Sequence, residues 1–487
     1  MATLIANTGI QLEVYQLEID LNTKSRRFFH EWFDEDNVEY NLEMVYQLPD
    51  SQKVYRTIDL ESHDYLSLDG KLKVEEDEIL ATPDIDVLYE GDIDDNSGIF
   101  SLRLNDARCS KIEELKNKWL PLPYYELDGL GGFKNGPYNW VRCKLIPRES
   151  RNRDKLSVYL LLAVDTRAIY RDTDEYRECP SFVSNTERRK NFKLDSSTRG
   201  LFNFLSGENS WIRDYLMNVV HGVTKLDGIR VENGDFRYSF LATYMLLIKS
   251  IDSQNVLPEI QLIRDRDVNY LDTEMIIDIG NSRTAAILFE ENDFTKVKPL
   301  QIQNFSKPLL DGKLNRTQES FDMRVAFQKV TFGEKALGGS NQFVWPSIVR
   351  LGTEAELLTN EVINLEDGDE ILSTYSSPKR YLWDTKSRRE EWRCVKLDSS
   401  GKTEEPRIEG VSNYLSNDGS INKDGTGFGF HYSRKSLMTL AFIEILTQAK
   451  VQINSEEYRE FHGRVSTPRR LNKIILTCPT AMSKKEQ

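Results

Sequence analysis

The most informative pattern of hydrophobic and polar positions lies in residues 275–289, where two apolar runs flank a short polar turn. The first run covers residues 275–277 and the second covers residues 284–289. Apolar β-type runs joined by a tight polar turn predict a β-hairpin. Gly280 and Asn281 tolerate positive φ angles, so we expect them to form a two-residue turn.

The chain before this hairpin is rich in β-type patterns. Short runs such as residues 11–19 are separated by polar turns up to about residue 105, which predicts antiparallel sheet. The continuous apolar run of residues 156–164 predicts a strand that is buried on both faces. A second layer must cover that strand. The candidates for this layer are two segments with helical patterns, residues 210–220 and 238–251.

After the hairpin the pattern predicts further strands and helices. Residues 343–351 are expected to form one extended element, and Pro378 stands where proline is favoured in the first turn of a helix. Ser433 is expected to cap an amphipathic helix that ends near Ile453. Residues 473–478 predict a buried strand that stops at a proline.

These patterns divide the chain into two regions. A chain of 487 residues is long for one hydrophobic core. We place the main boundary near residue 268, which gives a β-rich α+β domain over residues 1–268 and an α/β region over residues 269–487. Between about residues 384 and 432 the composition turns polar, which predicts a long exposed insertion.

Composition and charge narrow the range of partners. Hydrophobic residues make up 39% of the chain, as in a globular protein, and the net charge is −14. Because DNA and RNA are polyanions, this charge argues against nucleic acid as a partner. The longest apolar run, residues 240–248, is far shorter than the ~20 residues that cross a bilayer. The start of the chain has no secretory-signal pattern and the cysteines are scattered, which favours reduced thiols in the cytoplasm.

The turn of the predicted hairpin carries groups that can bind phosphate. Backbone N–H groups at such a turn point outward together and can cradle an anion. Asn281 and Ser282 add hydrogen-bond donors, and Asp278 can hold a hydrated divalent cation beside the phosphates. The alternative is an ordinary hairpin in which Gly280 and Asn281 only make the turn.

Four landmarks in chain order carry a resemblance to a known superfamily. They are Asp278-Ile-Gly-Asn-Ser282, Trp345-Pro-Ser-Ile-Val349, Pro378-Lys-Arg-Tyr-Leu382 and Ile474-Ile-Leu-Thr-Cys-Pro479. They resemble the first phosphate loop and the Thr-Pro-Ser, Ala-Lys-Arg-Leu-Ile and Val-Val-Thr-Val-Pro segments of the seventy-kilodalton heat-shock chaperones. The resemblance implies that residues 269–487 form the first half of an actin-like, ribonuclease-H-like ATPase domain.

The chain is also similar over most of its length to the bacterial SrfB-type virulence factors. Ile277-Asp-Ile-Gly-Asn-Ser-Arg-Thr284 matches their Leu-Asp-Ile-Gly-Asn-Ser-Arg-Thr segment, and Leu4-Ile-Ala-Asn-Thr-Gly-Ile10 also agrees with that family. The family name specifies no chemistry. The expectation of ATP binding therefore depends on the superfamily landmarks.

The resemblance to the chaperones implies roles for the residues of the loop. Asp278 would anchor a hydrated Mg²⁺ ion and take part in catalysis. Gly280, Asn281 and Ser282 would contact the β- and γ-phosphates of ATP, and Arg283 would complete the cofactor-binding set. The chaperone loop has threonines where this chain has Asn281 and Ser282.

The same resemblance implies roles for two residues outside the loop. Lys379 would position the attacking water and offset charge that develops on the γ-phosphate; otherwise it is an exposed lysine at a helix start. Pro479 matches the hinge proline of the chaperones, although proline also ends strands for structural reasons alone. The second phosphate loop and the adenosine motif would follow Pro479. We therefore expect an N-terminal part of a longer protein and weak nucleotide binding at most.

Three functions are compatible with the sequence. The first is a chaperone-like ATPase that couples its nucleotide state to the binding of an unknown protein partner. The second is a non-catalytic interaction scaffold that keeps the fold, with residues 1–268 recognising another protein. The third is a small-molecule kinase, because type III pantothenate kinases also use an Asp-Ile-Gly-Asn-Ser/Thr loop, although Lys379 and Trp345-Pro-Ser347 argue against it.

Overall fold

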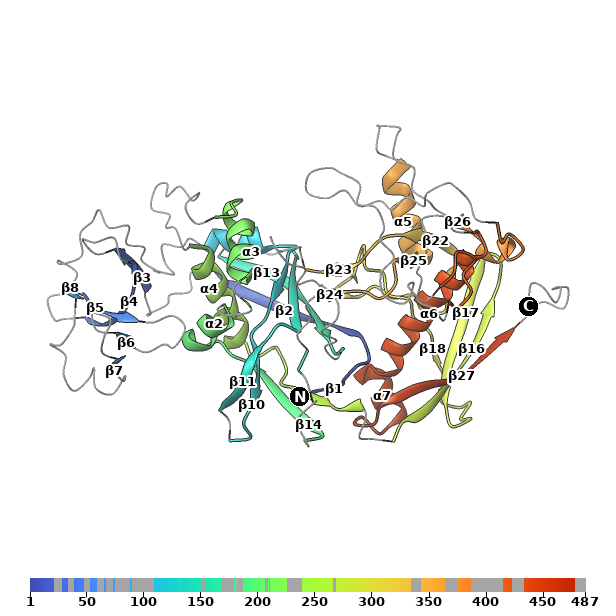
Figure 1. Cartoon of the computed structure of the whole chain (residues 1–487), viewed down its shortest axis with the longest axis horizontal. Coiled ribbons are helices and arrows are strands. Elements are labelled where there is room, and N and C mark those ends of the chain that lie inside the picture. Colours follow the sequence, from blue (N-terminus) through green and yellow to red (C-terminus); the bar gives the residue numbers. More distant parts are fainter. Residues whose placement is uncertain are drawn as a thin grey trace.

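The computed structural model describes most of the chain as a mixed α/β structure (Figure 1). The described residues are 1–21, 29–33, 39–47, 53–58, 65–66, 73–74, 88–89, 109–130, 132–149, 152, 154–167, 179–180, 182, 187–205, 209, 211–225, 239–265, 269–333, 343–363, 375–386, 415–422 and 433–477. Most of the predicted insertion at 384–432 and all of 478–487, including Pro479, lie outside them.

Two sheets dominate the first part of the chain. Their strands are β1 (Ala2–Ile5), β2 (Ile10–Asp20), β9 (Trp119–Pro121), β10 (Tyr124–Leu127), β11 (Phe133–Tyr138), β12 (Val141–Pro147), β13 (Lys155–Asp165), β14 (Arg189–Leu194) and β15 (Ile260–Ile263). One sheet has the order β1-β15-β14-β10-β11 and the other has the order β2-β13-β12-β9. β13 lies between two antiparallel neighbours, β2, which pairs with its whole length, and β12, which pairs with residues 158–164.

The burial of these elements confirms several expectations. Nearly every residue of β13 is buried, as its continuous apolar run predicts. The helices of this part are η2 (Cys109–Leu115), α2 (Thr198–Phe204), α3 (Trp211–His221) and α4 (Ser239–Ser253). The apolar run at 240–248 lies inside α4, where its large side chains join the same core as β13. Thus α3 and α4 confirm the predicted helices.

A smaller antiparallel sheet lies between β2 and η2 in the chain. Its strands are β3 (Phe29–Phe33), β4 (Glu39–Gln47), β5 (Lys53–Ile58), β6 (Tyr65–Leu66), β7 (Lys73–Val74) and β8 (Leu88–Tyr89). Neighbouring strands in it are antiparallel, as the alternation before residue 105 predicts.

The second large unit is built on the predicted hairpin. Its sheet contains β16 (Leu271–Ile279), β17 (Arg283–Glu290), β18 (Lys298–Pro299) and β27 (Arg469–Thr477) in the order β18-β17-β16-β27. β16 and β17 are antiparallel, whereas β16 and β27 are parallel. The helix α6 (Ser436–Ile453) crosses one face of this sheet and leads through α7 (Glu456–His462) into β27 (Figure 1).

Short elements complete this unit. They are β19 (Leu309–Leu310), β20 (Lys313–Leu314), β21 (Ser320–Asp322), β22 (Arg324–Phe327), β23 (Thr331–Phe332), β24 (Phe343–Val344), β25 (Val349–Leu351), α5 (Gly352–Ile363), β26 (Tyr375–Ser376) and η6 (Pro378–Tyr381). β22 lies between β25 and β26, and β21 pairs with β17 near the hairpin turn.

Three local predictions are wrong. Residues 343–351 form two short strands, β24 and β25, because Pro346 between them has no N–H to donate to a ladder. Ser433 does not cap α6, since the helix starts after Lys435 with no side-chain cap. The strand predicted at 473–478 exists over residues 473–477 as the end of β27, but its residues from 472 onward are exposed, because among the described residues β27 pairs only with β16.

The two large units meet along an extensive junction. Phe332, Phe343 and Trp345 belong to the same hydrophobic cluster as the core of β13 and α4. The buried guanidinium of Arg142 on β12 donates to the carbonyl oxygen of Phe332 at 2.7 Å and lies 4.2 Å from the ring centroid of Phe343. The hairpin of β23 and β24 is thus anchored in the first unit.

In the part of the chain that the structure describes, no helix combines the length and the apolar character that a membrane span requires.

Candidate functional site

The turn between β16 and β17 has the tight geometry that the sequence predicts. The N–H of Gly280 donates to the carbonyl oxygen of Arg283 at 2.9 Å, which leaves Asn281 and Ser282 as the central residues. Both side chains are exposed. The hairpin is confirmed, but its two central residues are Asn281 and Ser282, one position later than the expected Gly280 and Asn281.

The reason for the glycine differs from the expected one. Neither Gly280 nor Asn281 has a positive φ angle, so that expectation is wrong. A Cβ atom on residue 280 would lie 2.5 Å from the carbonyl oxygen of Arg283, which is closer than such atoms approach. Glycine is required at this position because the two strands approach closely there.

Two other chain segments hold the turn in place. The N–H of Met323 donates to the carbonyl oxygen of Ser282 at 2.9 Å, and the N–H of Ser377 donates to the carbonyl oxygen of Met323 at 2.8 Å. Ser377 adopts a left-handed conformation, with a φ of 56°, and directs the chain into η6. Met323 therefore holds the turn by one backbone hydrogen bond, and Ser377 in turn holds Met323.

Lys379 reaches the same turn from η6. Pro378 starts this short helix, which confirms its predicted place in a first turn. Its side chain is buried. The half-buried side chain of Lys379 donates from Nζ to the carbonyl oxygen of Ile279 at 2.5 Å. Ile279 is the residue directly after Asp278. The fold thus brings Lys379 to the turn, although they lie 100 residues apart in sequence.

Asp278 lies at the exposed end of β16 beside the end of β27. Its carboxylate accepts a hydrogen bond from the hydroxyl of Thr477, the residue that pairs with it across the parallel strands. An exposed carboxylate beside a hydroxyl provides the oxygen ligands that Mg²⁺ prefers. Among the described residues, no group of three or more His, Cys, Asp or Glu side chains is placed to hold a metal ion. A Mg²⁺ ion at Asp278 would therefore depend on water and phosphate oxygens for its other ligands.

Arg283 lies on the outer side of the turn. Its side chain is 73% exposed and its Nε atom is 3.2 Å from a carboxylate oxygen of Asp322 on β21. Surface ion pairs of this kind add little stability, so the guanidinium can rotate toward an anion at low cost. Asp278, Gly280, Asn281, Ser282 and Arg283 thus surround one exposed turn.

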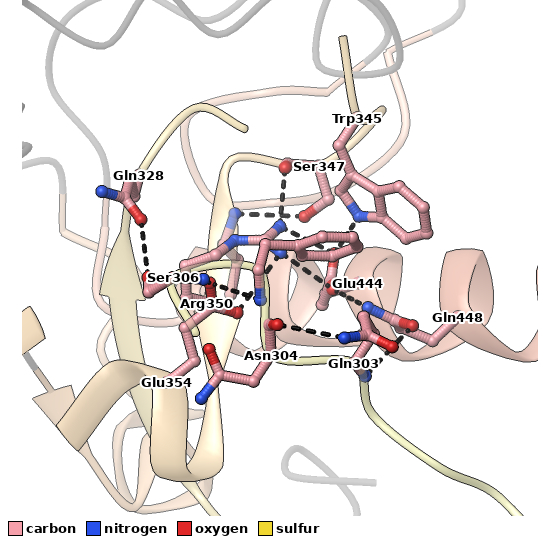
Figure 2. Close-up of polar contacts among 12 residues, drawn as sticks. Gln303, Asn304, Ser306, Gln328, Trp345, Ser347, Arg350, Glu354, Glu444 and Gln448 are labelled. Carbon is pink, nitrogen blue, oxygen red and sulfur yellow. Dashed lines mark hydrogen bonds and ion pairs between the residues drawn. The ribbon is translucent and has the colours of Figure 1, made fainter. Parts of the chain in front are cut away.

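Trp345, the first residue of the second landmark, lies in the core of the protein. Trp345 is 2% exposed and its indole Nε1 donates to Glu444 Oε2 at 2.8 Å (Figure 2). Arg350 on β25 donates to the same oxygen at 3.0 Å. Trp345 therefore anchors the core between β25 and α6.

A second carboxylate completes this buried cluster. Glu354, in the first turn of α5, lies 3.7 Å from Arg350 and accepts hydrogen bonds from the N–H groups of Phe305 and Ser306 at 3.0 and 2.8 Å. Desolvation raises the pKa of Glu354, and the charge of Arg350 opposes this shift only in part. Arg350, Glu354 and Glu444 were not among the candidate residues expected from the sequence. A glutamate at 444 within an otherwise apolar helical stretch was the available signal.

Comparison with known proteins gives one match. The model of a family described as "Virulence factor SrfB" matches residues 1–487. Neither the curated proteins nor the solved structures gave a match.

Proposed function

The chain belongs to the SrfB family of virulence factors, and from that premise we propose that its β16–β17 turn binds the phosphate chain of Mg-ATP. In this proposal the protein is a chaperone-like ATPase whose nucleotide state controls the binding of a protein partner. The observation that carries the proposal is the convergence of Asp278, the exposed turn and Lys379.

The exposed turn supplies donors for phosphate oxygens. Asn281 and Ser282 form its tip and point their polar groups to solvent, while the backbone around them is fixed by Met323. A rigid turn binds an anion without the cost of ordering a loop. Arg283 adds a positive charge at the rim. These features favour the phosphate end of a nucleotide as the ligand.

The magnesium ion fits the carboxylate of Asp278. Mg²⁺ commonly binds through one or two carboxylates together with water and substrate phosphates, so a single exposed aspartate suffices. Thr477 holds this carboxylate through its hydroxyl and fixes its orientation. When bound, the ion would neutralise charge on the β- and γ-phosphates.

Lys379 would act on the γ-phosphate side. Its ammonium group is half-buried and rests on the carbonyl oxygen of Ile279. A lysine chain that ends beside the turn can exchange this carbonyl for a phosphate oxygen or an attacking water after a small rotation. A fixed positive charge at that point stabilises charge that develops during phosphoryl transfer.

The cytoplasm is the compartment that suits this proposal. ATP is available there, and the thiols of Cys143 and Cys179 are free and buried in the structure. The partner would be a protein, whose identity depends on surfaces outside the turn.

Replacing Asp278 tests the site directly. Isothermal titration calorimetry of the protein with Mg-ATP and with Mg-tripolyphosphate should show weaker binding for Asp278→Asn by about tenfold or more, because the ion loses its only carboxylate. Asp272→Asn is the matched control, since Asp272 lies on the same face of β16 and pairs with Arg470. Equal affinity of the Asp278 variant and the wild type would contradict the proposed site. Because weak binding at most is expected of residues 1–487, it is absence of binding by a longer form of the protein that would favour the scaffold function.

Replacing Lys379 separates binding from catalysis. Lys379→Ala should lower the single-turnover rate of ATP hydrolysis about 10- to 100-fold, while the affinity for Mg-ATP changes less than about threefold. Arg380→Ala is the control, because Arg380 is the exposed cation next to it in η6. An unchanged rate in Lys379→Ala would remove this residue from the mechanism.

A further inference from the structure

A small pocket lies where the start of β2 meets the second large unit. Its walls are residues 10–12 of β2, the C-terminal half of α6 and residues on either side of the β19–β20 hairpin. Gln11 joins two of these walls, because its Nε2 atom donates to the carbonyl oxygen of Val451 at 3.2 Å. The pocket is partly open to solvent and has a volume of about 30 Å³. A ligand bound in it would contact both large units.

This pocket is separate from the proposed phosphate site. Its α6 residues lie near the end of that helix, which finishes at Ile453. The chain that follows η6 contacts the other end, where the N–H of Lys435 donates to the carbonyl oxygen of Asp384 at 3.1 Å. Binding in the pocket can therefore be measured without reference to ATP.

The two glutamines of the α6 wall are held at both ends of their amide groups. Gln448 donates to Glu444 Oε1 at 2.7 Å and accepts from the N–H of Gln303 at 3.4 Å (Figure 2). Gln452 donates to a main-chain carbonyl oxygen at 2.8 Å and accepts from the N–H of Gln301 at 2.8 Å. These amides form a fixed wall, so a ligand does not have to order them on binding.

Two other side chains of the pocket keep donors for a ligand. The guanidinium of Arg316 uses Nε on Gln303 Oε1 at 3.4 Å, and its Nη1 atom lies 3.5 Å from a carboxylate oxygen of Glu457. The side-chain amide of Gln301 has no hydrogen-bond partner among the described residues. Both groups can therefore donate to a bound acceptor.

The charge of Arg316 favours an anion as that acceptor. Among the described residues that line the pocket, Arg316 is the only charged one. Its side chain is 25% exposed, whereas Glu457 is 68% exposed and also lies 4.0 Å from Lys298. Solvent weakens an ion pair of this kind. Desolvation lowers the pKa of Arg316, and the charge of Glu457 opposes this shift only in part. A partly desolvated cation with a weak partner is stabilised by a further anion.

We propose that the pocket binds the carboxylate of a short-chain organic acid through Arg316 and Gln301. A volume of about 30 Å³ corresponds to roughly two or three water positions, which suits a carboxylate group and excludes a large ligand. The planar guanidinium matches the two oxygens of a carboxylate. Phe305 and Trp345, whose ring centroids are 4.6 Å apart, supply apolar surface for a short alkyl group.

Saturation-transfer NMR of sodium acetate with the full chain tests this site. We expect saturable binding in the millimolar range, because so small a ligand makes few contacts. Arg316→Gln should weaken the binding by about tenfold or more, since the charge-assisted hydrogen bonds are lost. Gln301→Leu should weaken it by about threefold, since one neutral hydrogen bond is lost. Arg464→Gln is the matched control, because Arg464 is 58% exposed and pairs with Glu291 at the surface.

Failure of acetate to bind the wild-type chain would overturn the proposal. Equal affinity of wild type and both pocket variants would overturn it too. Circular dichroism verifies that each variant is folded. Arg316→Lys keeps the charge but lacks the planar fork, so it should also bind acetate more weakly than wild type; unchanged affinity would contradict recognition of a carboxylate by its two oxygens.

Two competing probes test the class of ligand. Inorganic phosphate represents tetrahedral anions, and N-acetylglutamate amide represents the acidic side chain of a partner protein. We expect each to displace acetate only at a concentration about fivefold higher or more, because the pocket is small. Stronger binding of phosphate than of acetate would indicate a site for inorganic anions. Stronger binding of the blocked glutamate would indicate a docking site for a protein. Either result would contradict a free organic acid as the ligand.

Discussion

Gly280 shows how one residue fixes the geometry of the proposed phosphate site. The position has no positive φ angle, so its requirement for glycine comes from the carbonyl oxygen of Arg283. The sequence correctly predicted a tight turn there, but it attributed the glycine to a positive φ angle. A close approach between two strands produces no pattern in the local sequence. The same limit applies to Thr477, whose contact with Asp278 depends on a parallel pairing of strands almost 200 residues apart.

Adding a methyl group at Gly280 should open the turn. In Gly280→Ala the new Cβ would meet the Arg283 carbonyl oxygen, so the hydrogen bond from residue 280 is lost and the strands separate. We expect the free energy of unfolding to fall by about 1–3 kcal/mol and Mg-ATP binding to weaken. Urea unfolding monitored by fluorescence measures the first effect.

Asn281→Ala is the appropriate comparison for this variant. Asn281 is exposed at the tip of the turn, so its replacement should change stability by less than about 0.5 kcal/mol. A stable Gly280→Ala variant would show that the turn tolerates a wider spacing than the structure indicates.

At the scale of elements, the helices and long strands were the most predictable. The continuous apolar run of β13 and the periodicity of α3 reflect local burial, and the structure confirms both. The start of α6 was less predictable, because tertiary contacts rather than a side-chain cap set it. The exposure of β27 was not predictable either, since the sequence reports how apolar a strand is and not which edge it occupies.

The buried cluster that joins α5, α6 and β25 makes a prediction about pH. Glu354 and Glu444 share the buried Arg350, so one carboxylate charge is left without full compensation. Because the pKa of Glu354 is raised in the folded state, the stabilising contribution of this group is largest at low pH and declines as pH rises through that pKa. The free energy of unfolding of Glu354→Gln should therefore increase relative to wild type between pH 5 and pH 8.

Urea unfolding of both proteins at the two pH values provides the measurement. Glu356→Gln is the matched control, because Glu356 lies on the same helix, is 43% exposed and pairs with Arg324 at the surface. Its difference from wild type should be the same at both values. A Glu354→Gln variant that loses stability relative to wild type as pH rises would contradict the assigned direction of the pKa shift.

At the scale of the whole molecule, the contact between the two large units could not be predicted from the sequence. Arg142 donates to Phe332 of the β23–β24 hairpin, 190 residues further along the chain, and neither segment has a sequence motif that predicts this contact. The division near residue 268 stays a prediction. So do the roles of Asp278 and Lys379, whose proximity the structure shows. The expectation that both residues act at one site came from the resemblance to the chaperones, because the apolar pattern does not relate two positions that lie so far apart in the chain.

Hydrogen–deuterium exchange of the full chain with and without Mg-ATP tests the phosphate-binding turn most directly. The account predicts slower exchange at the amides of residues 279–284 and 378–382 when Mg-ATP is present, with little change in the core strand β13. Mg²⁺ alone should not produce this protection, whereas Mg-tripolyphosphate should reproduce it. Unchanged exchange at the turn under saturating Mg-ATP, or protection confined to another part of the molecule, would contradict the account.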